Sequence, residues 1–362
     1  MAADPEGRID VLLTRHSGHV EKVDIRSSRP RLARGLMAGR TPDEAAHLAG
    51  LVFSLCGRGQ AAAARAACEA ARGHTPEASD DVPVWRELAR EHAWRLLLDW
   101  PRETGQAPDM ASVMTLRQAP PENYAALLET LLTEKLLGEP PHQWLTRDLE
   151  GLEAWARQGA TLPARLFAEL LLTLGGGPDL GISQAALLPA LSEWNQEAAL
   201  SLAQRALDDE TFCAVPDWRG APAETGAVAR CHRQTLVAAW IARRGRGLGA
   251  RLLARLVELA ALPGHLRQGG TPVIRAWPLW EGVGIAGVET ARGLLFHVAR
   301  LGDGQVADYR ILAPTEWNFH PAGPLALALT GLTADEALEA RARLVARSLD
   351  PCVAFGLEIV DA

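Results

Sequence analysis

Apolar and polar positions alternate partly in two short runs near the start of the chain, Ile9–Leu13 and Val20–Ile25. The pair Ser17-Gly18 lies between them, and both residue types favour turns. An apolar period of two residues is typical of half-buried strands. We therefore expect a β hairpin within residues 1–30.

A second strand–turn–strand pattern follows Gly269-Gly270. The runs Leu294–Leu301 and Val306–Leu312 flank Asp303-Gly304. An Asp-Gly pair between alternating runs is a strong hairpin signal. This pattern predicts a β hairpin region over residues 270–315.

Between these two regions, leucines and other apolar residues recur at helical spacing. Thr41, with Pro42 after it and Glu44 three positions on, forms a capping box, a helix start worth about 1 kcal/mol. We expect a helical core over residues 41–265. Its expected helices are 42–56, 60–72, 84–100, 122–137, 149–157, 164–174, 184–208, 223–243 and 249–262.

A last helix is predicted from a second capping box, between Thr333 and Glu336, to about Ser348. It precedes Asp350-Pro351-Cys352, so residues 333–362 hold a C-terminal helix and an Asp-Pro-Cys segment. The expected fold class is α+β, predominantly α-helical, with small β-sheets from the N- and C-terminal segments. We expect a single domain over residues 1–362.

Composition narrows the class of protein further. Hydrophobic residues make up 48% and charged residues 22% of 362 residues, which is typical of globular proteins. The net charge of −7 gives no basic surface for nucleic acid. The longest uncharged stretch, 317–334, contains prolines and glycines, so no membrane insertion is expected. Met1–Arg8 has no apolar core of a signal peptide, which favours a cytoplasmic protein.

Five scattered cysteines, none in a Cys-x-x-Cys pair, suggest reduced thiols. Cys56 and Cys352 stand at turns beside expected helix ends, and thiolates are soft ligands for iron, nickel or zinc. On spacing alone, the favoured interpretation is that both are small buried hydrophobic residues. We interpret Cys68, Cys213 and Cys231 as core residues.

The histidines give weaker signals than the cysteines. His16 and His19 bracket the first turn and, taken alone, are turn histidines. We assign Glu91-His92 to a half-exposed helix face. The sequence contains no P-loop, dinucleotide fingerprint, nucleophile elbow or His-Glu-x-x-His motif.

Six segments resemble, in the same order, motifs of nickel–iron hydrogenase large subunits. Gly287–His297 resembles the stretch around Glu-Ala-Pro-Arg-Gly, and Asp350-Pro351-Cys352 resembles the terminal Asp-Pro-Cys-x-x-Cys-x-x-His. The other four are Thr14–His19, Gly39–Pro42 with Leu55–Gly57, Glu224–Arg230 and Ala313–Asn318. The resemblance is least clear over residues 75–215.

The chain departs from these motifs where the family holds its two metals. The second cysteine of each Cys-x-x-Cys is replaced, by Gly59 and by Phe355. Ser17 replaces a glutamate that relays protons in the family, and Glu358 replaces the terminal histidine. Half of the protein ligands of a nickel–iron centre are therefore missing.

This pattern is similar to that of the hydrogenase expression/formation proteins of the HupK/HoxV type. The resemblance implies a non-catalytic maturation scaffold, or chaperone, that carries the Fe(CN)2(CO) iron unit on Cys56 and Cys352, without nickel. It implies Arg292, His19 and Asp350 as residues around the iron unit. Maturation factors would deliver the unit, and the apo hydrogenase large subunit would accept it.

Two alternatives remain open. One is a divergent nickel–iron hydrogenase catalytic subunit, and the other is a metal-free structural paralogue in a redox complex. The sequence leaves open the individual donor and acceptor proteins, the oligomeric state, and whether both cysteines bind iron at once. The roles of Glu358 and of residues 75–215 are also left open.

Overall fold

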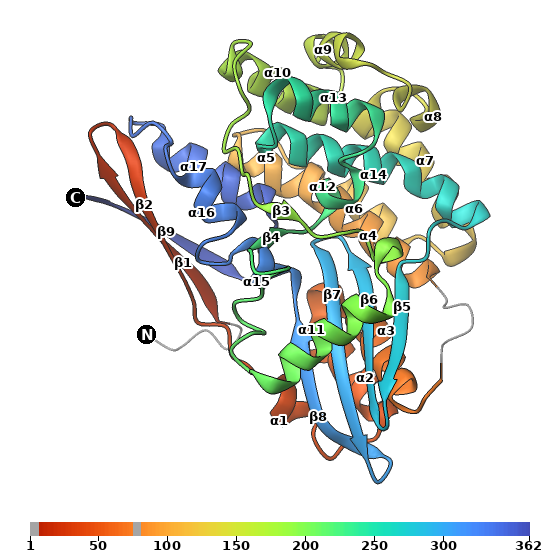
Figure 1. Cartoon of the computed structure of the whole chain (residues 1–362). Helices are drawn as coiled ribbons and strands as arrows, with labels where there is room; N and C mark the ends of the chain where they lie inside the picture. Colours follow the sequence, from red (N-terminus) through yellow and green to blue (C-terminus); the bar gives the residue numbers. More distant parts are fainter. Residues whose placement is uncertain (1–6, 75–80) are drawn as a thin grey trace.

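The computed structural model describes residues 7–74 and 81–362, and Figure 1 shows its helical layer above two separate sheet regions. The expected first hairpin is present, with strands β1 (Arg8–His16) and β2 (His19–Ser27). A third strand, β9 (Ala354–Asp361), pairs with β1 in parallel, so the order is β2-β1-β9. The N-terminal segment 1–6, part of the signal-peptide argument, lies outside the described residues.

The second sheet is a four-stranded antiparallel meander, so the hairpin expected in 270–315 is only half of it. Its first two strands escaped prediction because β6 is buried along its whole length and shows no alternation. The strands are β5 (Ile274–Trp280), β6 (Val283–Thr290), β7 (Gly293–Gly302) and β8 (Gln305–Leu312).

Helices cover both faces of this meander, which explains why β6 is fully buried. Helices α2 (Pro42–Val52) and α3 (Gly57–Ala71) lie behind it and α11 (Gln196–Asp208) in front (Figure 1). The alanine-rich α3 comes very close, because a Cβ on Gly284 would lie 2.3 Å from the backbone nitrogen of Ala71. Its other end lies beside Thr290, so α3 runs antiparallel to β6.

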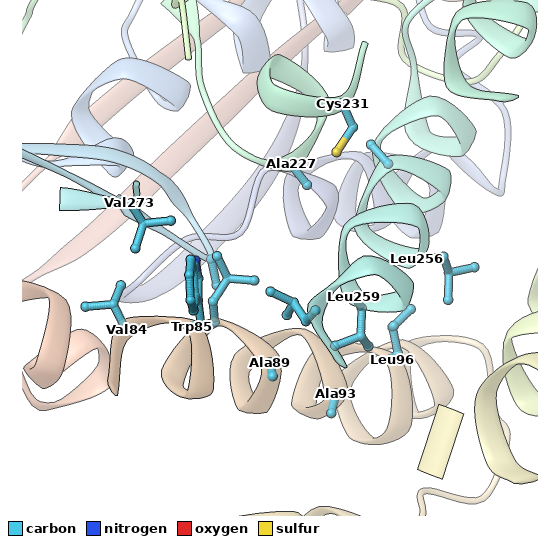
Figure 2. Close-up of a cluster of buried hydrophobic side chains, with 14 of the residues drawn as sticks. Val84, Trp85, Ala89, Ala93, Leu96, Ala227, Cys231, Leu256, Leu259 and Val273 are labelled. Carbon is cyan, nitrogen blue, oxygen red and sulfur yellow. The ribbon is translucent and has the colours of Figure 1, made fainter. Parts of the chain in front are cut away.

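A mostly helical layer lies above the meander and contains the long buried helix α14 (Leu248–Gln268). Figure 2 shows side chains of α4 (Val82–Trp94), among them Trp85 and Ala89, facing those of α14, including Leu259. The other elements of this layer are η2 (Arg95–Asp99), α5 (Trp100–Glu103), α6 (Met110–Gln118), η3 (Pro121–Asn123), α7 (Tyr124–Leu131), η4 (Leu132–Leu137), α8 (Pro141–Trp144), α9 (Leu149–Gln158), α10 (Leu162–Leu174), α12 (Ala227–Cys231) and α13 (Thr235–Arg244).

Three predicted helices begin later than expected, and the one expected over 223–243 begins at Ala227 and is interrupted between α12 and α13. The helix expected from residue 184 begins at Gln196, where Asn195 caps it. The residues before it form η5 (Leu191–Glu193) and β3 (Ala186–Leu187), which pairs with β4 (Ala223–Glu224). The final helix, α17 (Leu338–Ser348), starts after Thr333, because the backbone of Thr333 pairs with His19 in an isolated bridge.

The C-terminal helices pack against the first sheet and form a separate apolar cluster with it. The segment between α17 and β9 contains the Asp-Pro-Cys sequence, so the pairing of β9 with β1 fixes its position. Within residues 7–74 and 81–362, no helix combines the length and hydropathy needed to cross a bilayer. The remaining elements are α1 (Ala33–Met37), η1 (Ser54–Cys56), α15 (Pro314–Asn318) and α16 (Pro324–Leu329).

Candidate metal-binding site

Cys56 is the last residue of the short turn η1 and directly precedes α3. Because α3 runs antiparallel to β6, this end of the helix lies beside the turn between β6 and β7. That turn carries Arg292. The close packing of α3 on the meander therefore brings a cysteine and an arginine from distant parts of the sequence together.

Cys352 reaches the same place from the other end of the chain. It lies two residues before β9, is half-buried, and accepts a hydrogen bond from the Thr315 hydroxyl at 3.0 Å. Cys56 and Cys352 line one cavity of about 130 Å³ together with Arg292 and Arg29. We call this the cysteine pocket. Its volume is close to that of a protein cavity that holds one benzene molecule.

Two arginines supply positive charge to the cysteine pocket. Arg29 pairs with Glu316 and interacts electrostatically with both thiols. Arg292 is 4% exposed and donates from Nη2 to Glu91 at 2.8 Å. Its Nε and Nη1 are buried and have no hydrogen-bond partner in the described part of the chain. Buried donors of this kind are rare, so Arg292 has capacity for a further acceptor.

Asp350 holds Arg292 in a buried cluster of charges. Its carboxylate lies 2.6 Å from Nε of Arg95, 3.1 Å from Nη1 of Arg255 and 3.9 Å from Nε of Arg292. Burial alone would raise the pKa of Asp350, but the three guanidinium groups hold that pKa well below its usual range. The backbone of Asp350 is left-handed, with φ of 59°, a conformation that Asp and Asn tolerate best after glycine.

A chain of buried hydrogen bonds connects Cys56 to the centre of the meander. Gln60 donates from Nε2 to the Cys56 sulfur at 3.5 Å, and its Oε1 lies 2.9 Å from Nε2 of His297. Nδ1 of His297 lies 2.7 Å from the Tyr309 hydroxyl. All three bonds are satisfied when His297 carries its proton on Nε2 and accepts from Tyr309. Burial lowers the pKa of His297 to about 3, so the ring is neutral at physiological pH.

The thiol of Cys56 is a weak acid in this environment. Burial raises its pKa to about 11, and the opposing effects of Arg292 and the Gln60 amide are smaller. The first backbone N–H groups of α3, those of Arg58 and Gly59, donate to Glu87 at 2.8 and 2.9 Å. Cys56 is therefore protonated at neutral pH unless a metal displaces its proton.

Sequence comparisons identify the relatives of this chain. The hydrogenase expression/formation protein HoxV of Cupriavidus necator is 32% identical, over 93% of this chain and 93% of its own length. The corresponding protein HupK of Rhizobium leguminosarum bv. viciae is 33% identical, over 94% and 93%. The chain belongs to the hydrogenase expression/formation family of HoxV and HupK. Residues 265–357 also match the nickel-dependent hydrogenase family.

Solved structures show which fold this chain shares. The nickel–iron–selenium hydrogenase of Desulfovibrio vulgaris Hildenborough, in its as-isolated oxidized state, superposes with a TM-score of 0.56 at 14% identity, covering 94% of both chains. The reduced, active enzyme of Desulfomicrobium baculatum gives 0.54 at 14% identity, covering 94% of this chain and 95% of that chain. The fold is thus hydrogenase-like, and the predicted α+β class is confirmed.

In this HoxV/HupK relative, neighbouring side chains pack closely against Gly59 and Phe355, the two positions that replace cysteines of the hydrogenase motifs. A Cβ on Gly59 would lie 3.1 Å from Cγ2 of Thr290 and 3.3 Å from a carboxylate oxygen of Glu87. The ring of Phe355 lies in β9, under the guanidinium of Arg347 at 5.0 Å. Across residues 7–74 and 81–362, no group of three or more His, Cys, Asp or Glu could hold a metal ion.

The structure does not bring every sequence-predicted residue to the cysteine pocket. Cys56, Cys352 and Arg292 line it. Asp350 does not line the pocket, but its carboxylate lies 3.9 Å from Nε of Arg292. His19 is exposed on β2 and Glu358 is exposed on β9, and neither lines the pocket. His19 therefore has no position from which to contact either cysteine.

Sequence analysis did not predict some residues of the site. Glu91 contacts Arg292 and His92 is fully buried against Glu258 at 2.6 Å, so our assignment of a half-exposed helix face was wrong for His92. No motif marks Arg29 or Gln60. The one usable signal was His297, a histidine inside an apolar strand pattern.

Proposed function

We propose that this chain is a maturation scaffold that carries the Fe(CN)2(CO) unit of the nickel–iron cofactor on Cys56 and Cys352 and passes it to the apo hydrogenase large subunit. The observation that carries the proposal is the shared pocket of the two cysteines with Arg292. Relatives named as hydrogenase expression/formation proteins support a role in hydrogenase formation.

The chemistry of the pocket suits such a cargo. Two thiols lose their protons and bind one iron(II), giving an iron dithiolate and two released protons. Bound cyanide exposes nitrogen acceptors, and Nη1 of Arg292, which has no hydrogen-bond partner in the described part of the chain, is a donor of matching charge. Carbon monoxide needs no donor, and Leu55, Leu295 and Val353 supply apolar walls. The oxidation state of iron does not change in this exchange.

An iron unit held by two thiolates also suits transfer better than catalysis. The positions that would complete a nickel–iron site are Gly59, crowded by Thr290, and Phe355, covered by Arg347. A ligand set of two thiolates leaves the iron open to competing ligands from another protein. We therefore propose that the scaffold has no hydrogen-converting activity of its own and binds no nickel.

The test is an infrared spectrum of the protein purified from a host with the complete hydrogenase maturation machinery, with iron and nickel analysis of the same sample. We expect metal-bound carbonyl and cyanide bands with iron and without nickel. Cys56→Ser and Cys352→Ser should each lose the bands. Cys213→Ser is the matched control, because Cys213 is another half-buried free cysteine outside the cysteine pocket.

Two results would contradict the proposal in different ways. Stoichiometric nickel together with hydrogen uptake by the isolated protein would indicate a divergent catalytic subunit. Absence of both bands and metal, from a host that matures its hydrogenase normally, would favour the metal-free structural paralogue.

A further inference from the structure

A second and larger cavity borders Cys352, and it shares Leu55 and Val353 with the cysteine pocket. Its volume is about 510 Å³. Arg292 and Cys352 line both cavities, so the two meet at the proposed iron site. We call the larger one the arginine chamber, after the five arginines in its wall: Arg90, Arg95, Arg117, Arg292 and Arg347.

The two acidic residues in the wall of the arginine chamber are already engaged. Glu87 accepts from the first backbone N–H groups of α3. Glu91 accepts from Arg292 at 2.8 Å. Glu87 still interacts electrostatically with Arg90, so two carboxylates face five arginines in this wall.

Positive charge is left over in the chamber. Arg95 pairs with Asp350, and Arg347 donates to Glu103 at 2.9 Å. Arg90 and Arg117 have no ion pair within 4 Å in the described part of the chain. The buried Nη1 of Arg292 also lacks an acceptor among the described residues. In a chain of net charge −7, this is a local excess of donors without acceptors.

We propose that the arginine chamber receives an acidic peptide segment of the apo large subunit during transfer of the iron unit. The proposal rests on the function proposed above. Transfer requires a ligand of the acceptor to come within bonding distance of the iron, and Cys56 and Cys352 are half-buried in the wall of a cavity. The acceptor must therefore insert part of its chain.

The size and chemistry of the chamber favour a peptide over a small anion. The cysteine pocket, at about 130 Å³, is filled by the cargo itself. The chamber has about four times that volume and includes the indole of Trp94 beside its arginines. Arg117 is exposed and Arg90 half-exposed, so the charge extends from Cys352 to the surface. Carboxylates along an extended segment match this distribution.

The experiment follows transfer from iron-loaded protein to purified apo large subunit, monitored by the carbonyl and cyanide bands on each. The double variant Arg90→Glu/Arg117→Glu is compared with Arg65→Glu/Arg243→Glu, which changes the net charge equally. Arg65 and Arg243 are exposed and line neither cavity. We expect the chamber variant to transfer about tenfold more slowly at low salt, and the control at the wild-type rate. Added salt should slow the wild type towards the chamber variant.

A photocrosslinking residue at position 117 gives an independent measurement. It should join to a peptide of the large subunit that contains two or more Asp or Glu residues. Cross-links spread over neutral peptides would count against the proposal, as would wild-type transfer rates in the chamber variant. If sodium phosphate slows wild-type transfer more than sodium chloride of equal ionic strength, the chamber is a small-anion site and the proposal is wrong.

The outcomes for the two proposals remain distinguishable. A wild-type protein without carbonyl and cyanide bands refutes the carrier function itself. Normal bands with unchanged transfer in the chamber variant refute only the docking of an acidic segment. The chamber variant could instead carry weaker carbonyl and cyanide bands and still transfer normally per loaded molecule. That result would mean that the chamber binds the maturation factor that delivers the iron unit, which also overturns the proposal.

Discussion

Replacing Asp350 with asparagine tests how the fold holds the arginine beside the cysteines. The side chain keeps its size, and asparagine tolerates the left-handed backbone at φ of 59°. The variant removes one negative charge from contact with Arg95, Arg255 and Arg292. Arg95 and Arg292 keep Asp99 and Glu91 as partners, but Arg255 keeps no ion pair in the described part of the chain.

The expected loss of stability in Asp350→Asn follows from the burial of Asp350 and its arginine partners. Asp350 is 3% and Arg255 4% exposed, and breaking a buried pair from one side costs about 3–5 kcal/mol. For 362 residues the entropy of unfolding is roughly 0.76 kcal/mol per kelvin. Asp350→Asn should therefore lower the melting temperature by about 4–7 °C.

The loss should depend on pH with a defined sign. The pKa of Asp350 is depressed in the folded protein, so its contribution to stability is complete above the unfolded value of about 3.9 and decreases as the pH falls further. The difference in melting temperature between wild type and variant should be constant from about pH 8 to 5 and shrink below about pH 4. Differential scanning calorimetry across this range measures it.

Asp335→Asn is the matched control, because Asp335 also forms an ion pair with an arginine but its side chain is 52% exposed. Solvent screens an exposed pair, so the melting temperature should change much less in this control than in Asp350→Asn. A shift in Asp350→Asn no larger than in the control would refute the argument that Asp350 stabilises three buried arginines. A difference that stays constant down to pH 3 would refute the assignment of the effect to its carboxylate.

Two further predictions concern Cys56 and the position that replaces its family partner. Gly59→Cys should lower stability by about 1–3 kcal/mol in urea unfolding, because the new Cβ would crowd Thr290 at 3.1 Å, and it should bind no nickel by metal analysis. Gln60→Leu removes the donor to the Cys56 sulfur, so its thiolate fraction should fall and iodoacetamide should alkylate Cys56 more slowly at pH 9 in peptide mass spectrometry. Equal alkylation rates in wild type and Gln60→Leu would exclude a role for this bond.

Local sequence signals predicted much of the fold. The first hairpin follows from the Ser17-Gly18 turn, and both residues adopt positive φ there. The capping box at Thr41 is present with both of its hydrogen bonds. Strand β9 could not be found in this way, because its partner β1 lies more than 340 residues away and no local pattern records that pairing.

The candidate site was accessible to sequence reasoning only in part. Spacing gave no reason to join Cys56 to Cys352, and the resemblance to hydrogenases supplied that pairing. Their common pocket depends on two tertiary events, the packing of α3 on the meander and the pairing of β9 with β1. Arg95 and Arg255, which contact Asp350, lie in helical segments that the apolar periodicity predicted. The sequence did not show which face of each segment is buried.

Under the proposed carrier function, Cys56 meets two opposing demands, because a carrier must bind its cargo and later release it. A free Cys56 thiol with a pKa of about 11 is a thiolate in roughly one molecule in ten thousand at pH 7. Protons therefore compete with iron for this sulfur, and reprotonation favours the empty state once a competing ligand has displaced the thiolate. Arg292 acts in the opposite direction, because its positive charge favours the Cys56 thiolate over the thiol. A four-thiolate site would remove this balance, since bridging sulfurs shared between two metals cannot be released one at a time.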